Sequence, residues 1–191
     1  AKAICRELIA RENLTPWTSY ISPVAFDGEL AALMVAAGAT GMEVGSDSGC
    51  DAVLDRLRKG FRTDKIRRLA GVAKTHGLKD FHSFILGTSG ETMEDVEQTL
   101  NFVEDLDPFA AVMLVWVDDS EALDPQLALM RQDLRAEAYE RIGRRAQMQP
   151  RWVVPRLGIR CNPRSFAVLR KMGLRGPLWQ HLDRVSVGGN P

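Results

Sequence analysis

Short extended segments and amphipathic helical segments alternate along this chain, and this alternation restricts its possible folds more than any other feature. Extended apolar runs are predicted at residues 17–22, 40–44, 81–86 and 110–117. Between them, apolar side chains recur with the i, i+3, i+4, i+7 spacing of a helix that buries one face. Such alternation predicts βαβ units and a parallel sheet, either open or closed into a barrel.

Local signals indicate where these elements begin and end. Asp27 is a suitable N-cap residue for one helix, and Gly38 can adopt the left-handed conformation that ends it. Thr92 and Asp95 resemble a capping box in which Asp replaces Glu or Gln. The run 110–117 is almost continuously apolar, as expected for a parallel strand that is covered on both faces.

Composition excludes several classes of protein. With 45% hydrophobic and 26% charged residues, the chain is not intrinsically disordered. Its longest uncharged run, residues 30–42, is shorter than the roughly 20 residues of a membrane span. Cys5, Cys50 and Cys161 are too far apart for a CxxC-type metal site or a disulfide framework. They are interpreted as buried or idle thiols in a reducing, cytoplasmic compartment.

The charge of the chain is divided between two parts. Residues 1–125 contain 12 basic and 21 acidic side chains, whereas residues 126–191 contain 13 basic and 4 acidic ones. An arginine-rich helix is predicted over about 126–146. We therefore expect an α/β domain at 1–125 and an arginine-rich helical extension at 126–191. Their net charges of −9 and +9 favour docking of the extension on the domain.

Polar and glycine-rich segments follow each predicted strand. The carboxyl ends of parallel strands meet at one edge of a sheet, so functional side chains are expected there. These segments are Tyr20–Pro23, Glu43–Gly49, Gly87–Thr92 and Trp116–Asp119.

Taken singly, these motifs do not decide between a functional and a structural role. The GTSGET segment, residues 87–92, suits either an anion or adenosine cradle or an ordinary turn. Glu43, at an apolar strand end, needs ligand hydroxyls, other hydrogen-bond donors or a nearby Arg. The Lys59 side chain suits either a contact with a ligand carboxylate or exposure to solvent. The Asp-Ser-Gly in residues 45–49 lacks the histidine motif of a serine protease, and the three histidines are interpreted as structural.

Taken in order, the motifs resemble those of the radical S-adenosylmethionine (radical SAM) enzymes. The resemblance covers residues 17–119 through AAGATGMEVGSDSG, LDRLRKGFRTDKI, AKTHGLKDFHSFILGTSGETMEDVEQTLNFV and DPFAAVMLV. It implies a parallel, partial TIM-like barrel, namely about the last four βα units of a (β/α)6 barrel. The sequence pattern is most similar to that of family members that follow a cobalamin-binding domain, some of which are methyltransferases.

The resemblance also implies cofactors and site residues. In the family, a [4Fe-4S] iron–sulfur cluster reduces SAM to a deoxyadenosyl radical, and the protein positions and shields the reactants. The implied SAM-binding residues are Glu43, Ser46, Asp47, Lys59, Ile85, Gly87 and Glu91. Those implied to face SAM or the substrate are Tyr20, Ser22, Trp116 and Asp118.

One departure from the family pattern affects the interpretation. The CxxxCxxC loop that binds the cluster is absent from this sequence. We therefore interpret the chain as the C-terminal portion of a larger enzyme, inactive alone, whose cluster-binding segment lies upstream. A degenerate, non-catalytic relative is the alternative. The expected partners are the upstream half of the barrel, a cobalamin-binding domain and a small-molecule or peptide substrate.

Two other classes of function stay open at this stage. The basic tail could dock nucleic acid or an acidic protein. Against nucleic acid, Trp152, Phe166 and Trp179 have the spacing of core anchors. A different parallel-sheet enzyme could instead use GTSGET as an anion site for a phosphorylated small molecule.

Overall fold

A five-stranded parallel sheet forms the centre of the protein, which confirms the predicted fold class. A computed structural model describes residues 1–12, 15–116, 125–149, 151–154, 171–174 and 177–182. Neighbouring strands pair in the order β1-β2-β3-β4-β5, so each strand lies beside the next one in the sequence. The strands are β1 (Trp17–Tyr20), β2 (Ala39–Asp47), β3 (Lys79–Leu86), β4 (Ala110–Val115) and β5 (Trp152–Val153).

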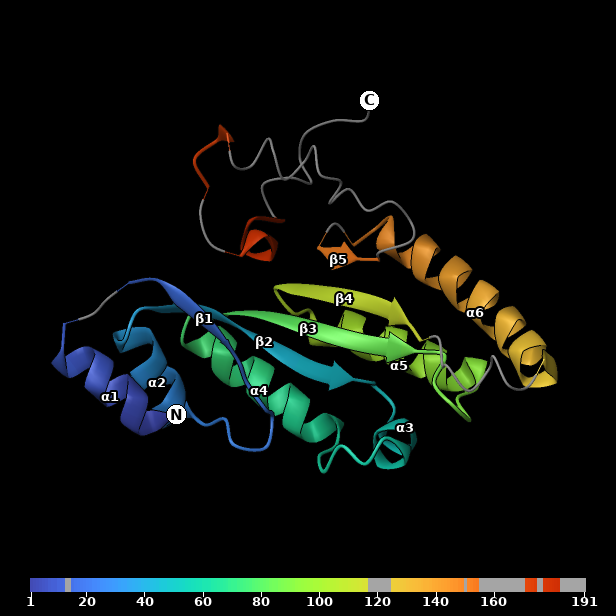
Figure 1. The fold of residues 1–191 in the computed structure, drawn as a ribbon, viewed down its shortest axis with the longest axis horizontal. Helices are drawn as coiled ribbons and strands as arrows, with labels where there is room; N and C mark the ends of the chain where they lie inside the picture. Colours follow the sequence, from blue (N-terminus) through green and yellow to red (C-terminus); the bar gives the residue numbers. More distant parts are fainter. Residues whose placement is uncertain (13–14, 117–124, 150, 155–170, 175–176, 183–191) are drawn as a thin grey trace.

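Helices connect the strands and cover one face of the sheet, with α2, α4 and α5 lying along it (Figure 1). The helices are α1 (Lys2–Ala10), α2 (Gly28–Ala36), α3 (Asp51–Arg56), α4 (Thr63–Thr75), α5 (Met93–Leu106), α6 (Pro125–Ala146) and the short 3-10 helix η3 (Leu178–His181). No helix in the described ranges has the length and apolarity needed to cross a membrane.

Two predicted caps are confirmed. The Asp27 side chain accepts a hydrogen bond from the Leu30 backbone N–H at 2.8 Å, which fixes the start of α2. At the start of α5, the Thr92 hydroxyl accepts from the Asp95 N–H, and the Asp95 carboxylate accepts from the Thr92 N–H. Asp therefore replaces the usual Glu without loss of the reciprocal pairing.

Side chains alternate between the two faces of the sheet, as strand geometry requires. On β3, Phe84 and Leu86 belong to the core formed with α3, α4 and α5, whereas Phe81, Ser83 and Ile85 point to the opposite face and are half-buried. We call this opposite side the open face. On β2 it carries Glu43, Gly45 and Asp47, which alternate with the core residues Met42 and Val44.

The segment after β4 contributes to the same sheet. The chain passes through α6 and returns as β5, which pairs in parallel with β4. The expected division at residue 125 therefore falls inside a β4-α6-β5 unit. No strand is predicted from the sequence here, because a two-residue strand is too short for a periodic pattern.

Docking of the basic part on the acidic part is confirmed for the described residues. Arg141 on α6 contacts Glu97 on α5 at 3.1 Å. Arg145 pairs with both Glu97 and Glu104. Exposed pairs of this kind each contribute about 0–1 kcal/mol, so they orient α6 more than they stabilise it. The predicted helix after Asn162 lies outside the described residues.

Candidate functional site

The carboxyl end of β2 carries an ion pair at the rim of the sheet. Lys59, which follows α3, places its Nζ atom 2.5 Å from the Asp47 carboxylate, and both side chains are partly accessible. Asp47 has a φ of 60°, in the left-handed region that non-glycine residues seldom occupy. The structure thus brings together two of the residues predicted to bind SAM, on a backbone held in an unusual conformation.

The GTSGET loop at the end of β3 is organised by Glu91. One carboxylate oxygen of Glu91, Oε2, accepts hydrogen bonds from the Thr88 N–H and hydroxyl at 2.8 and 3.1 Å. The other oxygen, Oε1, is buried and has no hydrogen-bond partner. Gly87 has a φ of 79°, which favours glycine. Burial raises the pKa of Glu91, and the hydrogen bonds from Thr88 partly oppose this rise.

Glu43 lies two side-chain levels below Asp47 on the open face. It accepts a hydrogen bond from the indole N–H of Trp179 on η3, with an Nε1–Oε1 distance of 3.2 Å. The hydrogen bond between Glu43 and the Tyr20 hydroxyl raises the pKa of Tyr20. The predicted residues Tyr20 and Glu43 are therefore in contact. Trp179 was missed, because no local pattern brings a residue 136 positions away to this strand.

Ser46 is separated from the other predicted residues. Its side chain is fully buried on the helix-covered face, where its hydroxyl lies 2.7 Å from Nδ1 of His82. Nε2 of His82 lies 3.1 Å from Asp80, which also accepts from the Phe109 N–H. The Ser46–His82–Asp80 series resembles a catalytic triad in order only, because the serine is closed off from any reactant. The structural interpretation of His82 is confirmed.

The remaining predicted residues lie around the same rim. Ile85 is half-buried on the open face, close to the GTSGET loop. Ser22 is exposed, and its hydroxyl accepts a hydrogen bond from the Val24 N–H. Trp116 is 45% exposed, and its backbone N–H bonds to the Leu86 carbonyl at the end of β3. Asp118 lies outside the described residues.

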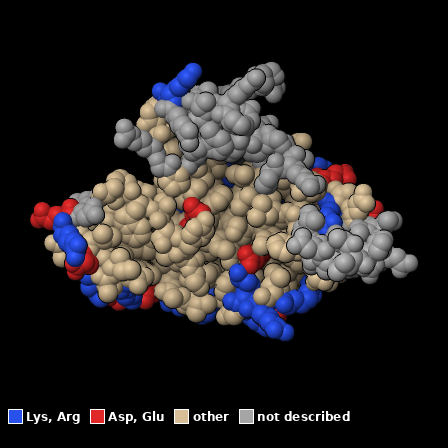
Figure 2. All heavy atoms as spheres, viewed as in Figure 1, with Lys and Arg blue, Asp and Glu red and all other residues tan. Residues whose placement is uncertain are grey.

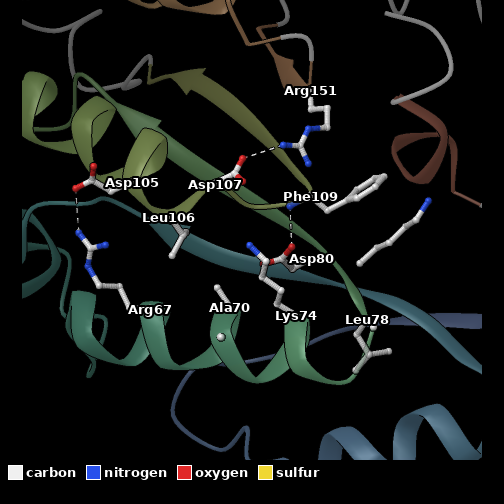
Figure 3. Close-up of a pocket in the computed structure, with 13 residues that line it drawn as sticks. Arg67, Ala70, Lys74, Leu78, Asp80, Asp105, Leu106, Asp107, Phe109 and Arg151 are labelled. Atoms are coloured by element: carbon white, nitrogen blue, oxygen red, sulfur yellow. Dashed lines mark hydrogen bonds and ion pairs between the residues drawn. The ribbon is translucent and has the colours of Figure 1, made fainter.

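A cavity of about 470 Å³ lies away from this rim (Figure 3). It opens between the ends of α4 and α5, where β3 and β4 begin, and Lys74, Asp80, Phe109 and Arg151 are among its lining residues. Its acidic groups already have partners: Asp80 bonds to His82 and Phe109, and Asp107 pairs with Arg151. We place the candidate site at the rim, because the buried Oε1 atom of Glu91 there has no hydrogen-bond partner.

The rim fits part of a SAM molecule but not an iron–sulfur cluster. An Asp–Lys pair matches the amino and carboxylate groups of a zwitterion, and the orphaned Glu91 oxygen can accept from an amino or hydroxyl group. By contrast, no group of three or more Cys, His, Asp or Glu able to hold a metal occurs among the described residues. Cys5 and Cys50 are buried, and burial raises the pKa of the Cys50 thiol.

The parallel sheet, with polar groups at the carboxyl ends of its strands, is consistent with part of an α/β, TIM-like barrel. The family model named Radical SAM superfamily matches residues 1–103, which is more than half of the chain. The chain therefore belongs to the radical SAM superfamily.

Relatives agree with this assignment. The anaerobic magnesium-protoporphyrin IX monomethyl ester cyclase of Rubrivivax gelatinosus is 26% identical over 106 residues, covering 54% of this chain and 19% of that protein. An uncharacterized methyltransferase of Pyrococcus horikoshii, PH0819, is 31% identical over 91 residues, covering 48% and 20%. The chain thus spans about a fifth of the length of the curated relatives it matches.

Solved structures show the same fold. The radical SAM methyltransferase TsrM from Kitasatospora setae, with cobalamin and a [4Fe-4S] cluster bound, matches with a TM-score of 0.55 and 26% identity, over 60% of this chain and 24% of TsrM. HemN, the coproporphyrinogen III oxidase of Escherichia coli, matches with a TM-score of 0.60 over 75% of this chain and 37% of HemN. At 17% identity, HemN supports the fold alone.

Proposed function

We propose that this chain is the C-terminal part of a radical SAM barrel and holds SAM at the rim formed by β2, β3 and their loops. The observation that carries the proposal is the Asp47–Lys59 pair at the end of β2, beside a loop with an orphaned acceptor on Glu91. In the proposed complex, Lys59 binds the SAM carboxylate, and Asp47 accepts from amino or hydroxyl groups. Ile85 and Gly87 border the adenine, and Glu91 accepts a hydrogen bond through Oε1.

The protein's contribution to the chemistry is positioning. When SAM and a cluster are bound, SAM supplies a deoxyadenosyl radical or, with cobalamin, a methyl group. The residues of this chain orient SAM from one side and exclude water. In this arrangement the reactants are bordered by Tyr20, Ser22 and Trp116. The half-buried ion pair is well suited to this task, because it can exchange its internal contact for two contacts with a zwitterionic ligand.

The proposed cluster lies on an upstream part of the same protein, which also completes the barrel. β1 supports this proposal, because among the described strands it pairs only with β2 and leaves its other edge open. A preceding parallel strand could pair there. The match to the cobalamin-binding TsrM supports a cobalamin-binding domain as a further partner. The buried thiols of Cys5 and Cys50 support a reducing, cytoplasmic location.

The test uses the parent protein, reconstituted with iron and sulfide under anaerobic conditions. We expect a reducible iron–sulfur signal by electron paramagnetic resonance, and reductive cleavage of SAM. Lys59→Met is expected to weaken SAM binding about tenfold, the effect of losing one charge-assisted contact of roughly 1.4 kcal/mol. Lys65→Met, on the exposed side of α4, is the matched control. A parent that shows neither signal, or equal SAM affinity in both variants, would contradict the proposal.

A further inference from the structure

The cavity at the amino ends of β3 and β4 offers room for a ligand away from the rim. Its volume of about 470 Å³ is typical of small-molecule sites, which span roughly 300–1,000 Å³. Lys79 lines the cavity, and Leu86 ends the same strand at the rim. The seven steps between these residues cover about 23 Å at 3.3 Å per residue. A ligand in the cavity therefore lies far from the rim.

Charged side chains make up much of the cavity wall. On the face shown in Figure 2, charged side chains lie mostly at the periphery. By contrast, seven of the 13 residues that line the cavity are charged. Four of them are basic and three are acidic, namely Arg67, Lys74, Lys79 and Arg151 against Asp80, Asp105 and Asp107. The kind of ligand that fits depends on which of these charges already have a partner.

The three carboxylates leave two of the four cations unpaired. Asp80 is 7% exposed, and both of its oxygens are hydrogen-bonded within the fold. Asp107 pairs with Arg151 at 2.8 Å. Asp105 lies 3.6 Å from Arg67, which is too long for a hydrogen bond, and 70% of its side chain is exposed. The carboxylates thus pair with the two arginines and not with the two lysines.

The two lysines have no carboxylate partner among the described residues. Lys79 donates to the Gln180 backbone carbonyl, and its Nζ atom lies 4.2 Å from the centroid of the Phe109 ring. Both of these contacts are with neutral groups. Lys74 forms neither a hydrogen bond nor an ion pair with any described residue. In Figure 3 its side chain extends from α4 toward the cavity. Lys74 is therefore a cation available to a ligand.

The balance of charges favours a ligand with a single negative charge. With Asp80 enclosed, four cations face two carboxylates, which leaves an excess of two positive charges. Helices α4 and α5 both end at the cavity, and each helix C-terminus carries about half a negative charge. The excess is then about one positive charge. A carboxylate matches this value better than a phosphate monoester, which carries about −1.5 to −2.

Gly71 gives an independent indication that the space is occupied by a ligand. It lies inside α4, where glycine makes a helix less stable than alanine does. Its backbone is helical, so no positive φ requires glycine. A Cβ atom there would meet no atom of the described residues within 4 Å, so no close packing requires glycine either. A ligand that lies against the bare backbone provides a reason for this residue.

We infer that this cavity binds a small molecule with one carboxylate and an apolar body, and that Lys74 is the binding residue for the carboxylate. Arg67 is a second donor, because its contact with Asp105 lacks a hydrogen bond. The apolar body lies over Gly71, against the apolar part of the wall, namely Ala70, Leu78, Leu106 and Phe109. The site goes beyond the proposed function, because it lies at the opposite end of the strands from the rim.

The test is an NMR titration of the ¹⁵N-labelled 191-residue chain with benzoate, using benzamide as the neutral probe of matched shape. We expect benzoate to shift the amide signals of Gly71 and Gly77, both of which line the cavity. Its Kd should be at least fivefold lower than that of benzamide, because a charge-assisted hydrogen bond is stronger than a neutral one. Phenyl phosphate, with its higher charge, should bind no more tightly than benzoate.

Two variants separate the anion contact from the space above the helix. Lys74→Met should remove most of the preference for benzoate over benzamide, whereas Lys65→Met, an exposed change elsewhere on α4, should keep it. Gly71→Leu fills the space and should weaken the binding of both probes at least fivefold. Ala32→Leu, on the exposed side of α2, is its matched control. Circular dichroism checks that each variant is folded.

Three outcomes would overturn the inference. Equal binding of benzoate and benzamide, or an undiminished preference in Lys74→Met, would show that the cavity does not select an anion through Lys74. Unchanged binding in a folded Gly71→Leu variant would show that the probes bind elsewhere. Tenfold tighter binding of phenyl phosphate than of benzoate would replace the carboxylate with a more highly charged anion.

Discussion

The two faces of the central sheet are built from the same strands but handle their polar groups differently. On the helix-covered face, Ser46, His82 and Asp80 bond to one another, so each buried polar group has a protein partner. On the open face and its rim, Glu43 forms no ion pair with any described residue, and the buried Oε1 atom of Glu91 has no hydrogen-bond partner. The difference indicates that one face serves stability and the other serves binding, even though alternate residues of one strand supply both.

The strongest test of this difference replaces one phenylalanine with alanine on each face of β3. Phe84 is fully buried against the helices, so Phe84→Ala should lower the free energy of unfolding by about 3–5 kcal/mol. Phe81, three residues earlier on the open face, loses mainly its contact with Trp179, so Phe81→Ala should cost about 1 kcal/mol. Urea denaturation followed by circular dichroism measures both. Equal losses would show that both faces carry the fold.

A second comparison uses two histidines. His82→Ala leaves the buried Asp80 carboxylate and Ser46 hydroxyl short of a partner and should cost about 2–3 kcal/mol. His76, at the end of α4, makes one hydrogen bond to the Val72 carbonyl, so His76→Ala should cost less than about 1 kcal/mol. The same denaturation assay applies. A His82→Ala variant as stable as His76→Ala would refute the structural role of the buried network.

The smallest effect is expected at the rim, in the pH dependence of stability. Burial raises the pKa of Glu91 above its unfolded value of 4.5, so at pH values just above 4.5 the folded state binds more protons than the unfolded state. Stability therefore falls as the pH rises through this window and levels off above the folded pKa. Glu91→Gln should remove this loss, whereas the exposed Glu94→Gln should keep it. Denaturation midpoints between pH 4 and 8 provide the measurement, and parallel pH profiles in both variants would contradict the assignment.

Sequence patterns located the rim better than they located the open face. Gly87 and Glu91 could be placed on one loop, because a strand end and a capping box fix their neighbours within a few residues. Asp47 and Lys59 could be placed at the same strand end for a similar reason. Alternation along β2 puts Ser46 on the same side as Met42 and Val44. Its enclosure with His82 could not be predicted, because His82 lies 36 positions away in the sequence.

The sequence by itself determined the alternation of strands and helices, the parallel sheet, the family and the edge of the sheet where polar loops gather. These follow from local periodicity and turn chemistry, which act over a few residues. Only the tertiary structure decided that β5 joins the sheet, that Trp179 reaches Glu43, and that Ser46 is enclosed with His82. Each of these depends on contacts between residues far apart in the chain, where packing and hydrogen-bond satisfaction select the partner and no local pattern encodes it.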